Sequence, residues 1–393
     1  MALSVIFMEW YDRGTSEGLK FDVEVALLLA EACLNDAVGD MARASALLNL
    51  GNVQVALFAF DRNPTLPVDA EASYRKSMKL NRKRDTWIWG MAHIGLSNAI
   101  MSLALSSGNL QRLQEAIAAA QVASDVFDRA DTPAEWGVAQ NGLGSSLQNW
   151  GERIGGPPIL EDAIQAYEKA LTVILPANSA RLWVSLQNGL GNSNKILGEW
   201  NFESGQFAIG MTYLRNAAQA FSAALSVIVP EKEPVLWATC KGNYGNVLSR
   251  IGLHSKSSAD CDAAIDSYQA ALDIWMKLGI GPQILSTQEN IAATLIERNF
   301  FEPRTENLER AEAILRELTD GAQADHTSLD WAKLQVNWAS LKLAYFDQTK
   351  KHGHLDEASK HAYVARKIFL NSGADQNRRR IDRLLSTIAR RRR

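Results

Sequence analysis

The sequence predicts an all-α, right-handed superhelical solenoid of about seven helix-turn-helix repeats, with capping helices at both ends. One phrase recurs in similar form as "WGVAQNGLGSSL", "WVSLQNGLGNSN" and "WATCKGNYGNVL". With the tryptophan of this phrase as position zero, the copies start at residues 43, 89, 136, 183, 237, 284 and 331. The spacings are 46, 47, 47, 54, 47 and 47 residues. A period of this length indicates stacked structural units, and each copy holds two apolar helical segments.

The first helix of each repeat is expected to begin just before position zero and to end about sixteen residues after it. In the third copy Thr132 is a suitable N-cap, Pro133 suits the first turn and Glu135 completes a capping box. Glycines recur fifteen residues after position zero, where they predict the end of the helix: Gly151, Gly198 and Gly252. A loop of roughly seven residues is then expected before the second helix.

The second helix is marked by an alanine 27 residues after position zero. The alanines at this position are Ala70, Ala116, Ala163, Ala264, Ala311 and Ala358. Ala217 fits the fourth copy if seven residues are inserted before its second helix, and this insertion accounts for the single spacing of 54. Phrases such as "LEDAIQAYEKALTVI" have the 3.6-residue apolar spacing of an amphipathic helix.

A Leu-Gly pair in the first helix and an Ala…Tyr…Ala set in the second recur together. Examples are Leu143–Gly144 followed by Ala163, Tyr167 and Ala170. A glycine inside a helix costs about 1 kcal/mol relative to alanine, so its recurrence at one phase predicts close approach of a neighbouring helix. This pattern, over about residues 43–370, resembles the tetratricopeptide repeat. The usual unit of that family has about 34 residues, and the longer units here look like those of bacterial multi-domain proteins.

The ends of the chain are expected to cap the array. Residues 1–42 contain one predicted helix, around 21–34, which would form a cap or half of an eighth pair. Residues 43–373 form the predicted solenoid, and residues 374–393 a C-terminal capping helix with an Arg-rich tail. Glycine and proline do not cluster into a linker, so no domain boundary is predicted.

The composition favours a cytoplasmic protein. The three cysteines, Cys33, Cys240 and Cys261, lie far apart in the sequence, which fits a reducing compartment. The start "MALSVIF" lacks the basic residues of a secretory signal. The apolar run "VALLLAEACL" is too short to cross a bilayer and contains Glu31, so no membrane partner is expected.

The resemblance to tetratricopeptide arrays implies that the first helices line a concave groove. Polar residues at three turns of these helices would then face a ligand: Asn52, Asn98, Asn141, Asn188, Asn192, Asn246, Gln148 and Lys195. A side-chain amide both donates and accepts, so such a row can pair with the backbone of an extended peptide. The alternative is that asparagine is only a tolerated polar residue on a solvated surface.

The aromatic residues suggest a second surface. Tryptophans at position zero are expected to pack between adjacent repeats. Trp150 and Trp200 are predicted at the ends of first helices, beside the long loops "GERIGGPPILE" and "GEWNFESGQFAIGMTY". These loops, with Trp150, Trp200 and Phe202, would either bind a partner or pack on themselves.

The charge is divided unevenly along the chain. Residues 377–393 hold eight arginines and one aspartate, a charge of +7, so the rest of the chain carries −10 to give the net −3. The tail would contact nucleic acid, contact an acidic protein surface (including this chain's own groove), or remain a solvated terminus. The arginines considered for such contacts are Arg378, Arg379, Arg380, Arg390 and Arg391.

Catalytic signatures are not found in the sequence. It contains no phosphate-binding loop, dinucleotide fingerprint or nucleophile elbow. His352, His354 and His361 are interpreted as a polar loop rather than a metal site, so neither metal nor cofactor is expected. An enzymatic role would need a catalytic partner in trans, such as a protease or an NTPase.

The sequence therefore favours a non-catalytic scaffold that binds a protein or an extended peptide. The acidic surroundings of the groove favour a basic partner. Such a protein would be a cytoplasmic bacterial adaptor or the regulatory subunit of a larger complex. The alternative is a subunit of a nucleoprotein or defence-type complex whose Arg-rich tail contacts nucleic acid.

Overall fold

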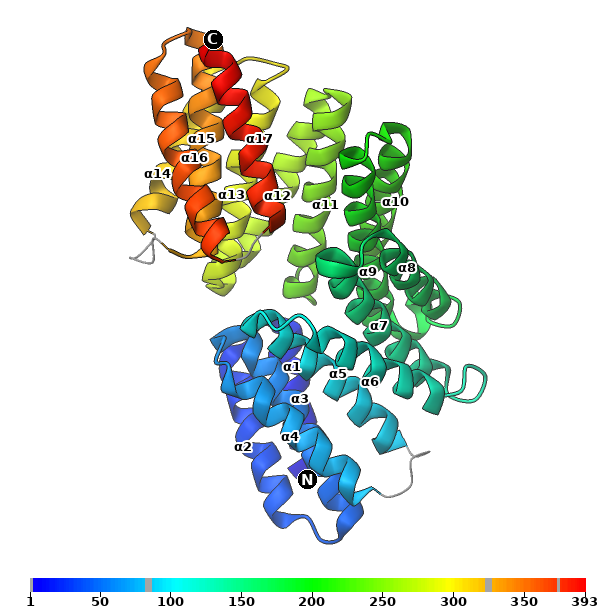
Figure 1. The fold of residues 1–393 in the computed structure, drawn as a ribbon. Helices are drawn as coiled ribbons and strands as arrows, with labels where there is room; N and C mark the ends of the chain where they lie inside the picture. The colour runs from blue at the N-terminus through cyan, green and yellow to red at the C-terminus, as the bar shows by residue number, and fades with distance from the viewer. Residues whose placement is uncertain (1–2, 82–86, 322–326, 373–374) are drawn as a thin grey trace. The chain divides into compact units, whose positions relative to one another are not determined.

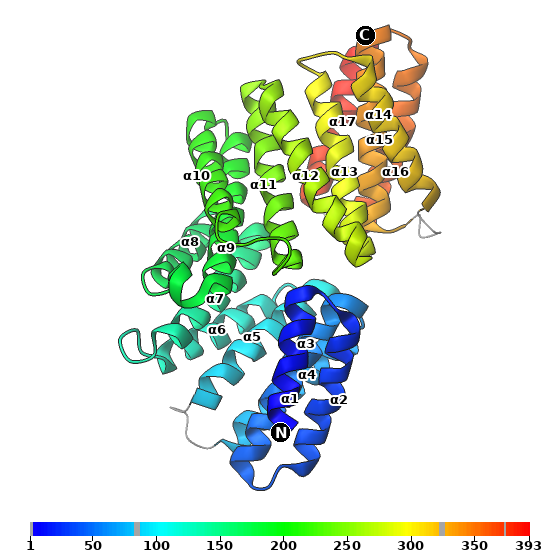
Figure 2. The ribbon, with the colours of Figure 1, turned by 180° about the vertical axis from the view of Figure 1, so that it is seen from behind.

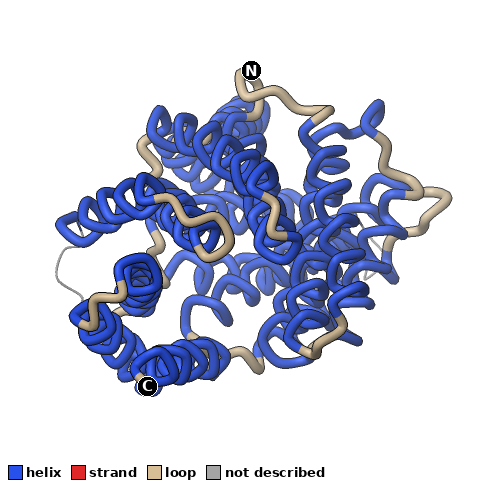
Figure 3. Tube along the Cα trace, turned by 90° about the horizontal axis from the view of Figure 1, so that it is seen from above, coloured by secondary structure: helices blue, strands red, loops and turns tan. Residues whose placement is uncertain are grey.

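The computed structural model describes residues 3–81, 87–321, 327–372 and 375–393. The described residues form seventeen α-helices and one turn of π-helix, and Figure 3 shows helices and loops only. Within each unit the helices pack mainly on the helices next to them in the sequence, as in α3 with α4 or α15 with α16. The predicted all-α solenoid of helix pairs is confirmed.

The chain divides into two compact units, Met1–Asn243 and Tyr244–Arg393. The sequence predicts no boundary here, because the division falls inside helix α11 (Pro234–Ser255), within a regular repeat phrase. The helices of the first unit are α1 (Leu3–Glu17), α2 (Lys20–Asp36), α3 (Asp40–Asp61), α4 (Thr65–Leu80), α5 (Trp87–Ser107), α6 (Arg112–Val126), α7 (Pro133–Trp150), α8 (Pro157–Leu171), α9 (Pro176–Glu203) and α10 (Phe207–Leu225).

The second unit continues the alternation of first and second helices. Its helices after α11 are α12 (Ser258–Leu278), α13 (Gly281–Asn299), α14 (Thr305–Gly321), α15 (Leu329–Thr349), α16 (Gly353–Asn371) and α17 (Asp375–Arg392). In Figures 1 and 2 α17 (red) lies beside α15 and α16, and its Ile381 and Ile388 are buried in the same core cluster as residues of these helices. The C-terminal helix thus covers the last repeat.

The N-terminal region contains two helices where the sequence predicts one. The helix expected around residues 21–34 is α2, and it packs on α1. Only Phe7 and Gly14 of α1 are buried. Gly14 lets the pair close, because a Cβ there would lie 2.7 Å from Cγ2 of Val23.

The prediction of long loops between the two helices of a repeat is wrong. Helix α9 runs through Gly198 to Glu203, and only three residues separate it from α10. In the third repeat a π-helical turn, Gly151–Gly155, continues α7 almost to the start of α8. The inserted residues of the fourth repeat therefore lengthen the helices.

The glycines fifteen residues after position zero let the two helices of a hairpin approach. A Cβ on Gly198 would lie 3.1 Å from the carbonyl oxygen of Gly210, and one on Gly252 would lie 2.7 Å from Sγ of Cys261. Gly151 caps the end of α7, as predicted, but Gly198 and Gly252 lie inside α9 and α11, so the predicted helix ends at these two glycines are wrong. The close contact that each interior glycine permits offsets its cost of about 1 kcal/mol relative to alanine.

The recurrent Leu-Gly pair makes room for an aromatic ring of the second helix. A Cβ on Gly51 would lie 2.7 Å from the ring of Tyr74, and one on Gly144 would lie 2.7 Å from the ring of Tyr167. The same rings also press on the next first helix, where a Cβ on Gly95 or Gly189 would lie 2.3 Å from them. Each of these tyrosine rings therefore lies between two glycines.

Helix α5 is the one described helix that is long and apolar enough to cross a membrane. Half of its apolar window is buried inside the structure. Its buried residues, including Leu96 and Ile100, share a core cluster with Tyr74 of α4 and Ala116 of α6. A core helix of a folded repeat passes the same test of length and composition.

Candidate binding surface

The polar row predicted on the first helices lies on α3, α5, α7, α9 and α11. All eight residues of the row are half-buried: Asn52, Asn98, Asn141, Asn188, Asn192, Asn246, Gln148 and Lys195. A fully solvated row would be more exposed, so these side chains belong partly to the packing between helices. Their individual contacts separate them into two groups.

The first group consists of amides with internal hydrogen bonds, and some of them are held by a tyrosine hydroxyl of the second helix. The hydroxyl of Tyr74 donates to Oδ1 of Asn52 over 2.8 Å, and that of Tyr268 donates to Oδ1 of Asn246 over 2.9 Å. Both tyrosines are buried, and burial raises the pKa of each phenol, so both hydroxyls remain protonated donors. In the third repeat the hydroxyl of Tyr167 donates to Oε1 of Gln148 over 3.3 Å and also lies 3.3 Å from Ser145 Oγ.

Other members of the row bond to the next first helix. The Nδ2 of Asn243 donates to Oδ1 of Asn188 over 2.9 Å, and Asn290 donates to Oδ1 of Asn246 over 3.1 Å. Oε1 of Gln148 accepts from Ser193 over 3.2 Å. The row therefore ties adjacent repeats together through its oxygen atoms.

The second group has no internal partner within the described residues. Asn98, Asn141, Asn192 and Lys195 make no side-chain hydrogen bond or ion pair there. Asn192 stands where Asn52 stands in its own repeat, but its second helix carries Phe221 and not tyrosine. A phenylalanine has no hydroxyl to donate, which leaves the amide of Asn192 available to a ligand.

In the second unit Glu289 of α13 occupies an equivalent repeat position, and it was not recognised from the sequence. It lies five residues after position zero, the position of Asn141 and Asn188, so its repeat phase was the signal that could have identified it. It is half-buried and has no ion-pair partner among the described residues. Burial raises the pKa of its carboxyl to about 7, against a lowering by Lys333 and a further raising by Asp330.

The aromatic residues assigned to loops lie on helices. Trp200 packs on Leu160 and Leu197, and the ring of Phe202 lies 5.9 Å from that of Phe207. Trp150 is the last residue of α7 and is half-buried. Trp200 and Phe202 are therefore part of hairpin packing, because the helices extend into the region expected to project.

The tryptophans at position zero pack between helices, as predicted. Trp136, Trp237 and Trp331 are half-buried and lie against separate core clusters. Trp87, which is off this phase, is half exposed, and its indole N–H donates to Glu135 over 3.1 Å.

The arginines of the tail lie on α17 and several bind acidic residues of the same unit. Arg391 pairs with Asp347 at 2.9 Å, Arg392 pairs with Asp356, and Arg380 lies 3.8 Å from Glu297. Arg390 bonds within its own helix to Ser386 and Thr387. Arg379 is exposed and Arg378 is half-buried. Exposed ion pairs of this kind contribute little, about 0–1 kcal/mol each, so the helix keeps a basic surface.

The cysteines and histidines are in packed positions. Burial raises the pKa of Cys240 to about 12 and that of Cys261 to about 11, so neither is a reactive thiolate near neutral pH. His352, His354 and His361 each lie against a different aromatic ring of α15 and form no shared site: Phe346, Tyr345 and Trp338. No cluster of three potential metal ligands occurs among the described residues.

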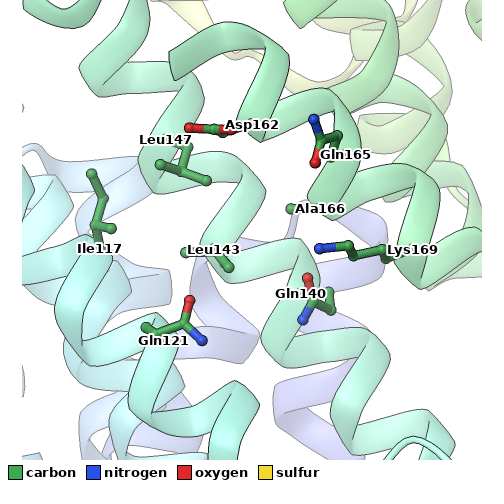
Figure 4. Close-up of a pocket in the computed structure, with 9 residues that line it drawn as sticks. All are labelled: Ile117, Gln121, Gln140, Leu143, Leu147, Asp162, Gln165, Ala166 and Lys169. Carbon is green, nitrogen blue, oxygen red and sulfur yellow. The ribbon is translucent and has the colours of Figure 1, made fainter. Parts of the chain in front are cut away.

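A polar cavity lies on the second-helix side of the first unit. It has a volume of about 300 Å³ and is bordered by α6 and α8, with α7 as its floor (Figure 4). Leu143 and Leu147 line the floor, while Gln121, Gln165 and Lys169 line the sides. The volume is at the lower limit for a small-molecule site.

The comparisons with known proteins concern the fold. No protein-family model and no curated protein matches the sequence. A Rap protein in complex with Competence and Sporulation Factor and the apo form of RapI are both 13% identical, with TM-scores of 0.50 and coverage of 99% of this chain and 97% of theirs. The apo quorum sensor NprR from B. thuringiensis is 14% identical over 98% of both chains, with a TM-score of 0.51. The chain thus has the fold of tetratricopeptide-containing proteins.

Proposed function

We propose that this chain is a non-catalytic scaffold that binds an extended protein segment along its first-helix face. The observation that carries the proposal is the half-buried amide row of the unit Met1–Asn243, in which Asn52 and Asn188 accept internal hydrogen bonds through Oδ1. In the same row Asn98 and Asn192 have no internal partner among the described residues and can both donate to and accept from a ligand. An amide fixed through its oxygen keeps two N–H donors, and these suit the carbonyl groups of an extended backbone. Fixed donors bind with less loss of side-chain entropy than mobile ones.

The charge of the surface favours a basic partner. In the second unit Glu289 is a half-buried carboxyl at the repeat position of Asn141 and Asn188, and a cation from a ligand would stabilise its charged form. The chain outside residues 377–393 carries −10. The Rap structure of the same fold was solved in complex with Competence and Sporulation Factor, so this fold accommodates a bound partner. The proposal includes that the protein acts in the cytoplasm of a bacterium, as a subunit of a regulatory complex.

The test is selection of a random peptide library on the purified chain, followed by affinity measurement with variants. The Asn98→Ala/Asn192→Ala double variant removes amides without internal bonds, so it leaves the packing intact. Each lost hydrogen bond is worth about 0.5–1.5 kcal/mol, so the selected peptides should bind roughly tenfold more weakly. The matched control is Asn201→Ala, whose amide bonds to Leu197 of its own helix. Equal affinity of wild type and double variant would reject the proposal.

The alternative of a nucleic-acid contact through α17 needs a test that preserves this helix. Deletion of residues 377–393 would expose the core under Ile381 and Ile388. Arg379→Glu/Arg390→Glu reverses two exposed charges instead. A salt-sensitive binding of DNA or RNA that this variant abolishes would support the alternative.

A further inference from the structure

A second cavity, larger and more aromatic, lies within the unit Tyr244–Arg393. It is bordered by α14 and α16, has α15 as its floor and has a volume of about 530 Å³. Its lining includes Trp331, Trp338, Lys342, Lys360, His361 and Val364. A volume of this size accommodates a small aromatic molecule or one large side chain.

This cavity and the one in Figure 4 occupy the same place in the repeat. Trp338 has the repeat position of Leu143, His361 that of Ala166, and Val364 that of Lys169. The two cavities therefore have the same architecture but differ in chemistry. The cavity in Figure 4 is lined by aliphatic and amide side chains such as Leu143 and Gln165, whereas the cavity of the last repeat is lined by the aromatic rings of Trp331, Trp338 and His361.

The aromatic wall is held rigidly. The rings of Trp338 and His361 are stacked, with centroids 5.7 Å apart and an interplanar angle of 14°. The indole N–H of Trp338 donates to Oγ1 of Thr319 over 2.9 Å, and Nδ1 of His361 lies 2.6 Å from Oε1 of Gln335. Nζ of Lys342 also lies over the Trp338 ring, 5.5 Å from its centroid. A planar ligand would therefore meet fixed ring edges whose polar atoms are already bonded.

The charges around the cavity leave one lysine unpaired. Lys342 lies 3.0 Å from Glu357 and 3.6 Å from Glu312, and Glu312 also pairs with Arg316 at 3.0 Å. Both carboxylates that line the cavity are thus neutralised by neighbours. Lys360 has no ion-pair partner among the described residues and is exposed at the rim. The uncompensated charge at the rim is positive.

We propose that this cavity binds a planar aromatic ring that carries a carboxylate. The ring packs against Trp331 and Trp338, and the carboxylate pairs with the ammonium of Lys360. A free aromatic acid and a peptide ending in tryptophan both have this chemistry.

The test is titration calorimetry of the full chain with indole-3-acetate, indole-3-ethanol and tryptamine. These probes share one ring system and differ in charge. We expect indole-3-acetate to bind about tenfold more tightly than tryptamine, with indole-3-ethanol between them. A peptide ending in tryptophan, compared with its C-terminal amide, separates the two sources. Tighter binding of the free-acid peptide than of indole-3-acetate assigns the ligand to a chain terminus, and the reverse assigns it to a small acid.

The variant Lys360→Glu should reverse the order of the charged probes, and because this residue is exposed the change should not unfold the protein. The matched control is Gln165→Glu, at the same repeat position in the other cavity, which should leave the order unchanged. Absence of binding by all three indoles would overturn the proposal. An order that Lys360→Glu does not alter would also overturn it.

Discussion

In the first and third repeats the second helix inserts a tyrosine ring between two glycines, whereas in the last two repeats smaller side chains lie at this position against alanine. In the first unit the ring of Tyr167 meets Gly144 of its own repeat and Gly189 of the next. In the repeat that starts at 284, Ala292 and Leu315 take the places of Gly144 and Tyr167, and both belong to one core cluster. The second helix has a smaller side chain here, leucine in place of tyrosine. The first helix has a larger one, alanine in place of glycine, which fills part of the space. Glycine in this array is therefore one member of a pair and not a requirement of the fold.

The last repeat moves the large ring to a different helix. Ala339 and Ala362 take the two positions of the pair, and Trp338 stands at the position of Leu143 in the third repeat. Trp338 is buried, and its ring borders the aromatic cavity on the second-helix side. Close packing requires that volume lost at one site is filled from a neighbouring one, and here the filling also changes the chemistry of a surface.

The largest expected effect comes from removing a ring that lies between two glycines. Tyr167→Ala leaves a cavity between the helices that carry Gly144 and Gly189, because the ring fills the space between these two glycines. The substitution should lower the free energy of unfolding by about 3–5 kcal/mol. Urea denaturation followed by circular dichroism measures this loss. The control is Tyr363→Ala, because that ring is exposed and its truncation should have little effect. A loss below about 1 kcal/mol for Tyr167→Ala would show that the ring is not an essential core element.

The next effect tests whether the residues of the pair depend on each other. Gly144→Ala places a Cβ 2.7 Å from the ring of Tyr167, and overpacking of this kind should cost about 1–3 kcal/mol in spite of the better helix propensity. In a Tyr167→Leu background, which reproduces the Ala292–Leu315 pair, the same change should become neutral or stabilising. A double-mutant cycle in urea measures the coupling. Additive effects of the two substitutions would mean that the two kinds of pair are unrelated.

The sequence was sufficient to predict the all-α array, because apolar periodicity and a recurring phrase are local properties. It also predicted that the repeated glycines allow close contact. It did not identify α1, since few of its residues are buried, and it ended the first helices at Gly198 and Gly252. The sequence does not distinguish a glycine that ends a helix from one that lets a neighbouring helix approach, because the difference depends on the tertiary structure around the glycine.

The candidate site could be predicted only in part for the same reason. Repeat phase placed the asparagines on one face, but their partners are tyrosine hydroxyls or amides on other helices, such as Tyr74 for Asn52. Glu289 has the right phase and differs from the asparagines only in residue type. The two cavities were not predicted, because each one needs three helices to form its walls.

A smaller effect is expected from the hydroxyl of the inserted ring. Tyr74→Phe removes the 2.8 Å hydrogen bond to Asn52 and should lower the free energy of unfolding by about 0.5–1.5 kcal/mol. The reverse substitution is Phe221→Tyr, because it adds a hydroxyl at the repeat position of Tyr74, and Asn192 has the repeat position of Asn52. Urea denaturation of both variants compares them. If Tyr74→Phe has the stability of wild type, the bond does not hold Asn52 in place.

The smallest effect comes from a glycine that has lost its ring. Gly142 has the phase of Gly95 and Gly189, but the second helix before it carries Ala120, where the helices before Gly95 and Gly189 carry Tyr74 and Tyr167. A Cβ on Gly142 would meet only Ile94, at 4.0 Å. Gly142→Ala should therefore raise the free energy of unfolding by up to about 1 kcal/mol, since alanine favours the helix and restricts the unfolded chain. The opposite change in the later region, Ala292→Gly, should lower it by at least about 1 kcal/mol. If Gly142→Ala destabilises the protein, glycine is needed at this phase even without a ring, and the pairing of ring with glycine would no longer explain the difference between the two regions.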